Sequence, residues 1–193
     1  MNDFIAIDFE TANDSPDSAI SIGLVKYRVY KPLASYYSLI KPPVLNIWPR
    51  FTEIHGLTAD DVKAAPDFKY IWENEIRGFI GSAPLVAHNT PFDMKVLSAV
   101  LNYYAIPVPP LPYFCSLRMS RNVWPELPSH SLKNLAKAFD ISYDAHNAAA
   151  DADTCARIVV LCMETVTARS KRKSLLPLES LLKKTGTKME ILS

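Results

Sequence analysis

Near its N-terminus the chain reads FIAIDFETAN, at residues 4–13, where four apolar residues run directly into an acid. Such a run predicts a buried β-strand, and the side chains of a strand alternate between its two faces. Asp8 and Glu10 therefore project from one face, and Phe9 projects from the other. Two like charges roughly 6–7 Å apart repel each other unless something neutralises them. The pair fits either a solvated strand end or half of a metal site built from carboxylate oxygens.

The overall composition is that of one folded globular domain, because 49% of the 193 residues are apolar. The sequence contains no run of about 18 apolar residues, so we expect no transmembrane helix and no membrane partner. The first residues lack a basic and apolar leader, so we expect no signal peptide. Cys115, Cys155 and Cys162 form no C-x-x-C pair, which favours a reducing, cytoplasmic location and argues against a zinc site.

The order of the expected elements predicts an α/β fold with a mixed central sheet flanked by helices. Strands are predicted at residues 4–12, 19–30, 34–40, 84–89 and 113–116. Helices are predicted from periodicity and capping residues at residues 58–62, 67–81, 90–104, 130–139 and 147–166. Residues 41–51 contain several prolines and are predicted to form a loop.

Charge is distributed unevenly along the chain, although the net charge is only +1. Residues 1–165 carry 14 Lys and Arg against 18 Asp and Glu, whereas residues 166–193 carry 7 against 2. We therefore divide the chain into a domain at residues 1–167 and a basic C-terminal tail or linker, with a marginal helix, at residues 168–193. This segment would either attract a polyanion or serve as a solvated linker that carries a partner-binding helix.

A third acid, Asp93, lies in the first turn of the predicted helix at residues 90–104. Thr90 and Asp93 have the spacing of a capping box, and acids are generally favoured at helix starts. The alternative interpretation of Asp93 is a metal ligand. His88 and Asn89 stand where the preceding strand ends, which is a frequent place for ligand contacts in α/β folds, although both could equally be structural.

A fourth acid, Asp151, begins the long predicted helix at residues 147–166. At about 100° per residue, Asp151 and Asp153 point about 200° apart around the helix axis, so both cannot face one site. Asp151 shares a face with Cys155 and borders the buried stripe, where a carboxylate needs a partner. Asp153 is expected to be solvated. His146, on the loop that enters this helix, is either a polar loop residue or a candidate base beside Asp151.

Taken together and in this order, these motifs resemble the DEDD exonuclease superfamily. The matching motifs are Asp8-x-Glu10, His88-Asn89-x-x-Phe92-Asp93 and His146-x4-Asp151. The spacing of the histidine resembles the DEDDh branch, which includes the DnaQ-like epsilon subunit of DNA polymerase III, oligoribonuclease and ribonuclease T. The resemblance covers about residues 3–166, and the segments IHGLT at 54–58 and HSLKNLA at 130–136 also look like family segments.

The resemblance implies a ribonuclease H-like fold, with residues 1–167 as the exonuclease domain. It also implies metal-dependent 3′→5′ hydrolysis of nucleic acid, with release of nucleoside 5′-monophosphates. We expect DNA with single-stranded 3′ ends to be favoured over RNA, and a DNA polymerase or another replication or repair protein to be a partner. The alternatives are an RNA-trimming 3′→5′ exoribonuclease and a catalytically idle, polymerase-associated binding module.

The resemblance further implies roles for individual residues. The implied ligands of two divalent ions, Mg²⁺ or Mn²⁺, are Asp8, Glu10, Asp93 and Asp151, and the implied general base is His146. The residues expected to contact the substrate are Phe9, Thr11, His55, His88 and Asn89. Two ions about 3.5–4 Å apart, held by carboxylates, suit phosphodiester hydrolysis. The sequence departs from many relatives at Ala12-Asn13, where they have Thr-Gly, and at Pro91 inside the second motif.

Overall fold

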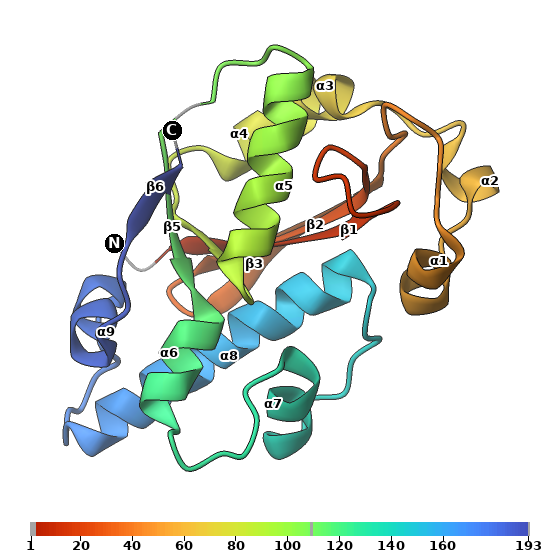
Figure 1. Cartoon of the computed structure of the whole chain (residues 1–193). Helices are drawn as coiled ribbons and strands as arrows, with labels where there is room; N and C mark the ends of the chain where they lie inside the picture. The colour runs from red at the N-terminus through yellow and green to blue at the C-terminus, as the bar shows by residue number, and fades with distance from the viewer. Residues whose placement is uncertain (1–2, 109, 193) are drawn as a thin grey trace.

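A six-stranded mixed sheet forms the centre of the computed structural model, which describes residues 3–108 and 110–192 (Figure 1). The strands run in the order β3-β2-β1-β4-β5-β6. They are β1 (Phe4–Thr11), β2 (Ala19–Arg28), β3 (Lys31–Leu39), β4 (Leu85–Ala87), β5 (Leu111–Cys115) and β6 (Glu190–Leu192). Strands β1, β2 and β3 are antiparallel neighbours, β4 runs parallel to both β1 and β5, and β6 is antiparallel to β5. The predicted mixed sheet is therefore confirmed.

Helices cover both faces of this sheet (Figure 1). They are α1 (Pro49–His55), α2 (Ala59–Val62), α3 (Phe68–Ile71), the π-helical turn η1 (Trp72–Ile76), α4 (Arg77–Ile80), α5 (Thr90–Tyr103), α6 (Ser116–Val123), α7 (Leu132–Ala138), α8 (Ala148–Arg169) and α9 (Leu178–Thr185). Helices α3 and α5 pack on one face, and α6, α8 and α9 pack on the other. Among the described residues, none of these helices is long and apolar enough to span a membrane.

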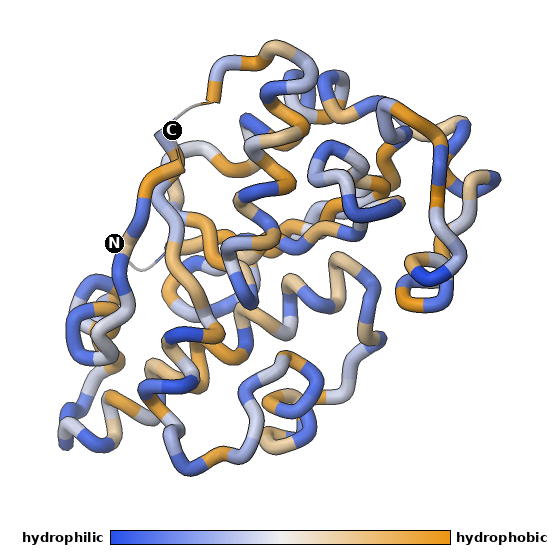
Figure 2. Tube along the Cα trace, in the orientation of Figure 1, coloured by the Kyte–Doolittle hydropathy of each residue, from blue (hydrophilic) through white to orange (hydrophobic). Residues whose placement is uncertain are grey.

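The alternation of side chains along β1 assigns its acids to one face of the sheet. Phe4 and Ala6 belong to the apolar cluster on the α8 side, while Ile5, Ile7 and Phe9 belong to the cluster on the α5 side. The two acids continue the alternation of Phe4 and Ala6, so they face α8, as the sequence predicts. Figure 2 shows hydrophobic residues concentrated along the strands and hydrophilic residues along many loops and helix turns.

The first turn of α8 lies directly on β2 because Gly23 has no side chain. A Cβ atom at Gly23 would lie 2.1 Å from the carbonyl oxygen of Ala148. Gly23 is also the residue that pairs with Asp8 across the β1–β2 ladder. This close approach of two backbones therefore brings the start of α8 next to the acids at the end of β1.

Two helices occur where the sequence predicts none. Helix α1 begins at Pro49, inside the expected loop, because a proline in the first turn of a helix lacks only an N–H group that would have no partner there. Helix α6 follows β5 without a connecting loop. Its buried positions are Ser116, Met119, Ser120 and Val123, so serines occupy half of the buried face and the apolar signal of the segment is short.

Residues 168–192 differ from the expected tail or linker, because they fold back onto the domain. Four leucines of this segment lie in the buried apolar cluster that contains α8, namely Leu176, Leu178, Leu181 and Leu182. The side chain of Asn122 donates a hydrogen bond to the carbonyl of Thr185 at 2.7 Å, and β6 extends the sheet beside β5. Burial of the leucine face supplies the apolar contact that docks α9. The domain boundary at residue 167 stays a prediction.

Replacing Gly23 with alanine should destabilise the protein, because the new methyl group would overlap the backbone of α8. Overpacking of this kind costs roughly 1–3 kcal/mol, so the melting temperature should fall by several degrees. Gly78→Ala is the matched control, since a Cβ at Gly78 would meet no atom within 4 Å and this glycine lies inside α4. The control should gain about 0.5–1 kcal/mol. An unchanged melting temperature for Gly23→Ala would contradict the close packing of α8 on β2.

Candidate active site

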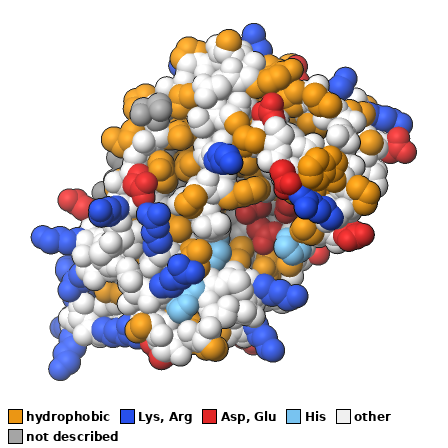
Figure 3. Space-filling model, viewed as in Figure 1, with side chains coloured by type: hydrophobic (Ala, Val, Ile, Leu, Met, Phe, Trp, Pro, Cys, Tyr) orange, Lys and Arg blue, Asp and Glu red, His pale blue; other side chains and the backbone are white. Residues whose placement is uncertain are grey.

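Four acids from three distant segments meet at one end of the sheet. Asp8 and Glu10 lie in the last half of β1, while Asp93 and Asp151 lie in the first turns of α5 and α8. Burial raises the pKa of Asp8 well above its usual range, and the charges of the other three carboxylates raise it further. Figure 3 shows acidic side chains gathered in a hollow of the surface beside a histidine.

The pKa values of the other three acids are also raised. Burial and, to a smaller extent, the charge of Asp151 raise the pKa of Glu10 to about 8. Burial is also the main cause of the raised pKa values of Asp93 and Asp151. Each charged form loses water and faces other negative charges, and both effects favour the neutral acid. A bound cation would reverse this preference for the whole group.

Asp93 faces β1 and does not cap its own helix. Its side chain is 1% exposed, and Oδ1 accepts a hydrogen bond from the backbone N–H of Phe9 at 3.3 Å. The N-cap residue of α5 is Asn89, with a left-handed φ of 80° and no side-chain cap hydrogen bond. The capping box predicted from Thr90 and Asp93 is therefore replaced by a contact between α5 and the central strand.

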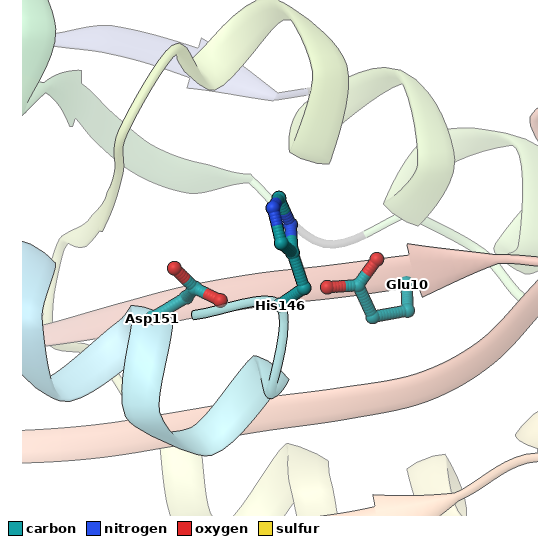
Figure 4. Close-up of side chains that lie close together, drawn as sticks. All are labelled: Glu10, His146 and Asp151. Carbon is teal, nitrogen blue, oxygen red and sulfur yellow. The ribbon is translucent and has the colours of Figure 1, made fainter. Parts of the chain in front are cut away.

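The start of α8 positions the fourth acid and a histidine. The N-cap residue Asn147 accepts hydrogen bonds from two backbone N–H groups of the first turn. His146 precedes this cap with a left-handed φ of 67°, which few residues with a side chain adopt. The side chains of Glu10, His146 and Asp151 lie close together in Figure 4, and their potential ligand atoms are within 4.8 Å of one another.

Asp153 is separated from this group, as the helical geometry predicts. Its carboxylate pairs with Arg157 at 2.7 Å and accepts a hydrogen bond from the hydroxyl of Tyr27 at 3.2 Å. The side chain is 30% exposed, so Asp153 is held in an ion pair and is not freely solvated. The two acids of the same helix turn therefore have different environments.

The donor set of this group fits hard divalent cations. The Oδ2 atom of Asp151 is buried and has no hydrogen-bond partner among the described residues. A buried carboxylate oxygen without a partner is costly, and a cation would satisfy it. A group of carboxylate oxygens with one nearby imidazole suits Mg²⁺ or Mn²⁺ better than metals that prefer sulfur.

His88 makes contacts within the protein, which fits the structural alternative, and its contact with substrate stays a prediction. Its Nδ1 lies 2.9 Å from Oγ of Ser116, and its Nε2 lies 2.8 Å from the carbonyl oxygen of His130. Burial lowers the pKa of His88 to about 4, so the ring is neutral at physiological pH. With both nitrogens engaged, the ring ties the end of β4 to α6 and to the segment before α7. Asn89 is exposed at the start of α5.

The three other predicted substrate contacts lie around the end of β1 with different accessibility. The ring of Phe9 is 2% exposed and packs against Phe68 on the opposite face, so only its backbone is directed toward the acids. Thr11 is 4% exposed. His55 accepts a backbone N–H on Nδ1 at 3.0 Å, so its neutral ring carries the proton on Nε2. Burial lowers the pKa of His55, and the nearby charge of His146 contributes to this.

Two features of the site are missed by the sequence analysis. A cavity of about 220 Å³ adjoins the end of β1 and is lined in part by Thr11, Phe51 and Phe92. Phe92 is 44% exposed, and the signal that could have identified it is an aromatic residue directly before an acid at a helix start. Tyr143 is the second feature, because burial and the adjacent Asp151 together raise its pKa to about 12.

Comparisons with known proteins identify the family. The RNase_T family model, described as an exonuclease, matches residues 5–159 of the chain, so the chain belongs to this exonuclease family. The chain is 30% identical to the PolC-type DNA polymerase III of Halalkalibacterium halodurans over 152 residues, which are 77% of the chain and 10% of the polymerase. It is 32% identical to the corresponding polymerase of Streptococcus thermophilus over 116 residues, which are 60% of the chain and 8% of the polymerase. The chain therefore spans about a tenth of the length of these relatives.

Solved structures have the same fold. Exonuclease X in complex with 5′ overhanging duplex DNA superposes with a TM-score of 0.69 at 22% identity, covering 95% of this chain and 99% of that one. The nuclease domain of 3′hExo, a DEDDh family member bound to rAMP, superposes with a TM-score of 0.70 at 17% identity, covering 91% and 96%. The predicted ribonuclease H-like fold is thereby confirmed. The family match also confirms the predicted membership of an exonuclease family.

The raised pKa of Glu10 predicts how the stability of the metal-free protein depends on pH. A carboxyl with a pKa of about 8 when folded, against an ordinary value of 4.5, binds its proton more tightly in the folded state. Its contribution to stability is therefore complete below pH 4.5 and is lost as the pH rises to about 8. Measured in a chelator, the melting temperature should decline across this window, and Glu10→Gln should flatten the decline. The exposed Glu126→Gln is the control and should keep the parent slope; equal slopes for both variants would argue against a buried, protonated Glu10.

Proposed function

We propose that the chain is a metal-dependent 3′→5′ exonuclease that releases nucleoside 5′-monophosphates, with single-stranded 3′ ends of DNA as the favoured substrate. The proposal is supported above all by the convergence of four carboxylates and His146 at one end of the sheet, in a chain of the exonuclease family. Mutual repulsion within this group has no evident structural purpose, whereas binding of divalent cations gives it one.

The proposed roles follow from the position of each side chain. The ligands of two divalent ions, Mg²⁺ or Mn²⁺, would be Asp8, Glu10, Asp93 and Asp151. When bound, such ions supply a nucleophile at neutral pH and offset the charge that develops on the phosphate. His146 would accept the proton of the attacking water, because its ring lies next to Glu10 and Asp151 on an exposed loop and so remains open to solvent.

The terminal nucleotide would occupy the end of β1. The cavity lined in part by Thr11, Phe51 and Phe92 suits a single base, since exposed aromatic rings stack on bases of any sequence. The ring of His55 is close to the backbone of Thr11, and its Nε2–H group would donate to the substrate. Asn89, exposed at the start of α5, would contribute a further polar contact. Phe9 would contribute only its backbone.

DNA is preferred to RNA in this proposal because the polymerase relatives at 30–32% identity are DNA polymerases. The same relatives support an association with a DNA polymerase or another replication or repair protein. The RNA-trimming alternative is supported by the fold neighbour bound to rAMP and by a second neighbour that recognises a histone mRNA stem-loop. A catalytically idle binding module is disfavoured, because such a module has no need for four repelling acids.

A cytoplasmic location is part of the proposal. The cysteines of the described chain are free and buried, namely Cys115, Cys155 and Cys162. Free cysteines are usual in proteins of a reducing compartment.

Digestion of matched DNA and RNA oligomers should separate the two substrate classes. With Mg²⁺ or Mn²⁺ present, we expect mononucleotides to be released faster from single-stranded DNA than from RNA of the same sequence. A blocked 3′ end or a chelator should stop the release. Faster release from RNA would favour the trimming enzyme, and no release from either oligomer would contradict the proposed activity.

Substitutions of Asp151 and His146 should affect metal binding differently. Asp151→Asn should lose nearly all activity and most of the thermal stabilisation that Mn²⁺ provides, because stabilisation by a ligand follows its affinity. His146→Ala should slow hydrolysis by about 10²–10⁴-fold, the usual contribution of a general base, while keeping the stabilisation by Mn²⁺. Melting curves with and without Mn²⁺ and single-turnover rates would measure both effects.

Asp153→Asn is the matched control for this pair, because Asp153 lies in the same helix turn but pairs with Arg157. Its activity and its stabilisation by Mn²⁺ should remain close to those of the parent. If His146→Ala lost the stabilisation as fully as Asp151→Asn, then His146 would be a metal ligand and not the base.

A further inference from the structure

A buried hydroxyl group, that of Ser116, contacts two of the segments that carry acids of the site. Ser116 is fully buried at the start of α6. Its Oγ lies 3.2 Å from the carbonyl oxygen of Ala87, the last residue of β4, and 3.2 Å from Sγ of Cys155 in α8. A buried hydroxyl is costly unless it forms hydrogen bonds, and Ser116 forms them to two different elements.

Both contacts lie close to an acid along the chain. Helix α5 begins three residues after Ala87, and Asp93 lies in its first turn. Cys155 lies one turn after Asp151, so these two side chains share a face of α8. The charge of Asp93 contributes, after burial, to the raised pKa of the Cys155 thiol, in agreement with a thiol that also lies near Asp93. Ser116 therefore links the segments that carry the third and fourth acids.

The hydrogen bonds of His88 fix the direction of this link. A carbonyl oxygen can only accept, so Nε2 of His88, 2.8 Å from the carbonyl of His130, carries the proton. The ring is neutral, so its Nδ1 accepts from the hydroxyl of Ser116 at 2.9 Å, and the carbonyl of Ala87 shares the same proton at the longer distance. The hydroxyl oxygen is then free to accept from the thiol S–H of Cys155.

Helices α5 and α8 need such a link because they pack on opposite faces of the sheet. Apolar packing between them therefore cannot set the separation of their acids. The contact with Gly23 fixes α8 against β2, and the hydrogen bond of Asp93 fixes α5 against β1. Ser116 is the first residue of α6, which packs on α8 and follows β5, the neighbour of β4. Its hydroxyl thus connects the two layers at the end of the sheet where the acids lie.

We propose that Ser116 is a positioning residue that holds Asp151 at the separation from Asp93 that divalent cations require. Cys155 is its contact on α8, and His88 is the acceptor that directs its hydroxyl. This inference rests on the proposed function, since it assumes that the acids bind Mg²⁺ or Mn²⁺. Ser116 acts through the elements that it joins and touches neither cation nor substrate.

Titration of Mn²⁺ without substrate, followed by electron paramagnetic resonance, tests the inference. Cys155→Ala removes the hydrogen bond to Ser116, so the Kd for Mn²⁺ should rise about three- to tenfold, the usual worth of one hydrogen bond. Ser116→Ala should raise it at least as much, because both arms of the link are lost. Cys155→Ser has nearly the volume of the alanine variant but keeps a donor, so its Kd should stay close to that of the parent.

Cys162→Ala is the matched control, because Cys162 lies two turns further along α8 and is also fully buried. Loss of its buried sulfur should lower the melting temperature much as Cys155→Ala does, while the Kd for Mn²⁺ stays unchanged. The comparison separates the position of the acids from the general stability of the helix.

Hydrolysis of a single-stranded DNA octamer, dT8, gives a second measurement. In Cys155→Ala, kcat should fall while KM stays near that of the parent, and Cys155→Ser should recover kcat. An unchanged Kd for Mn²⁺ in Cys155→Ala or Ser116→Ala, an equal defect in the alanine and serine variants of Cys155, or a like defect in Cys162→Ala would each overturn the inference. A parent enzyme that binds Mn²⁺ but does not hydrolyse dT8 would contradict the proposed exonuclease function alone, since the Kd values would still decide the role of Ser116.

Discussion

Repulsion among carboxylates that are withdrawn from water is the constraint on which the arrangement of the site depends. Three acids raise the pKa of Asp8 in addition to its burial, and Asp151 keeps a buried oxygen without a partner among the described residues. A protein pays for such a group in stability, and without a cation the group responds by holding protons. The surrounding fold is therefore the scaffold that forces the acids together, and a divalent cation would make the arrangement favourable.

Two backbone contacts bring the acids together. The start of α8 packs on Gly23, which pairs with Asp8 across the β1–β2 ladder. The backbone N–H of Phe9 donates a hydrogen bond to the carboxylate of Asp93. Because β4 is parallel to β1, the helix that follows β4 begins at the same end of the sheet where the acids of β1 are exposed. Strand direction and a missing side chain thus position groups that no local sequence preference would bring together.

The sequence predicted the mixed sheet and the face of β1 that carries the acids. Both predictions were possible because the apolar residues recur with a period of two in the strands and with helical spacing in the helices. It could not predict α6, whose buried positions include Ser116 and Ser120, or the docking of α9, which depends on apolar surface supplied by α8. For the site, motif spacing led to the four acids and His146. The internal role of His88 could not be predicted, since its partners Ser116 and His130 are brought to it only by the fold.

The packing of α8 on β1 also affects the order in which contacts form during folding. Strands β1, β2 and β3 are consecutive antiparallel neighbours that can pair early, whereas contacts between β1 and α8 close a loop that contains most of the chain. Contacts between distant segments bear a larger entropic cost and form later. The fourth acid therefore joins the other three only when the domain is essentially complete, so a nascent or partly unfolded chain has no assembled group of four acids.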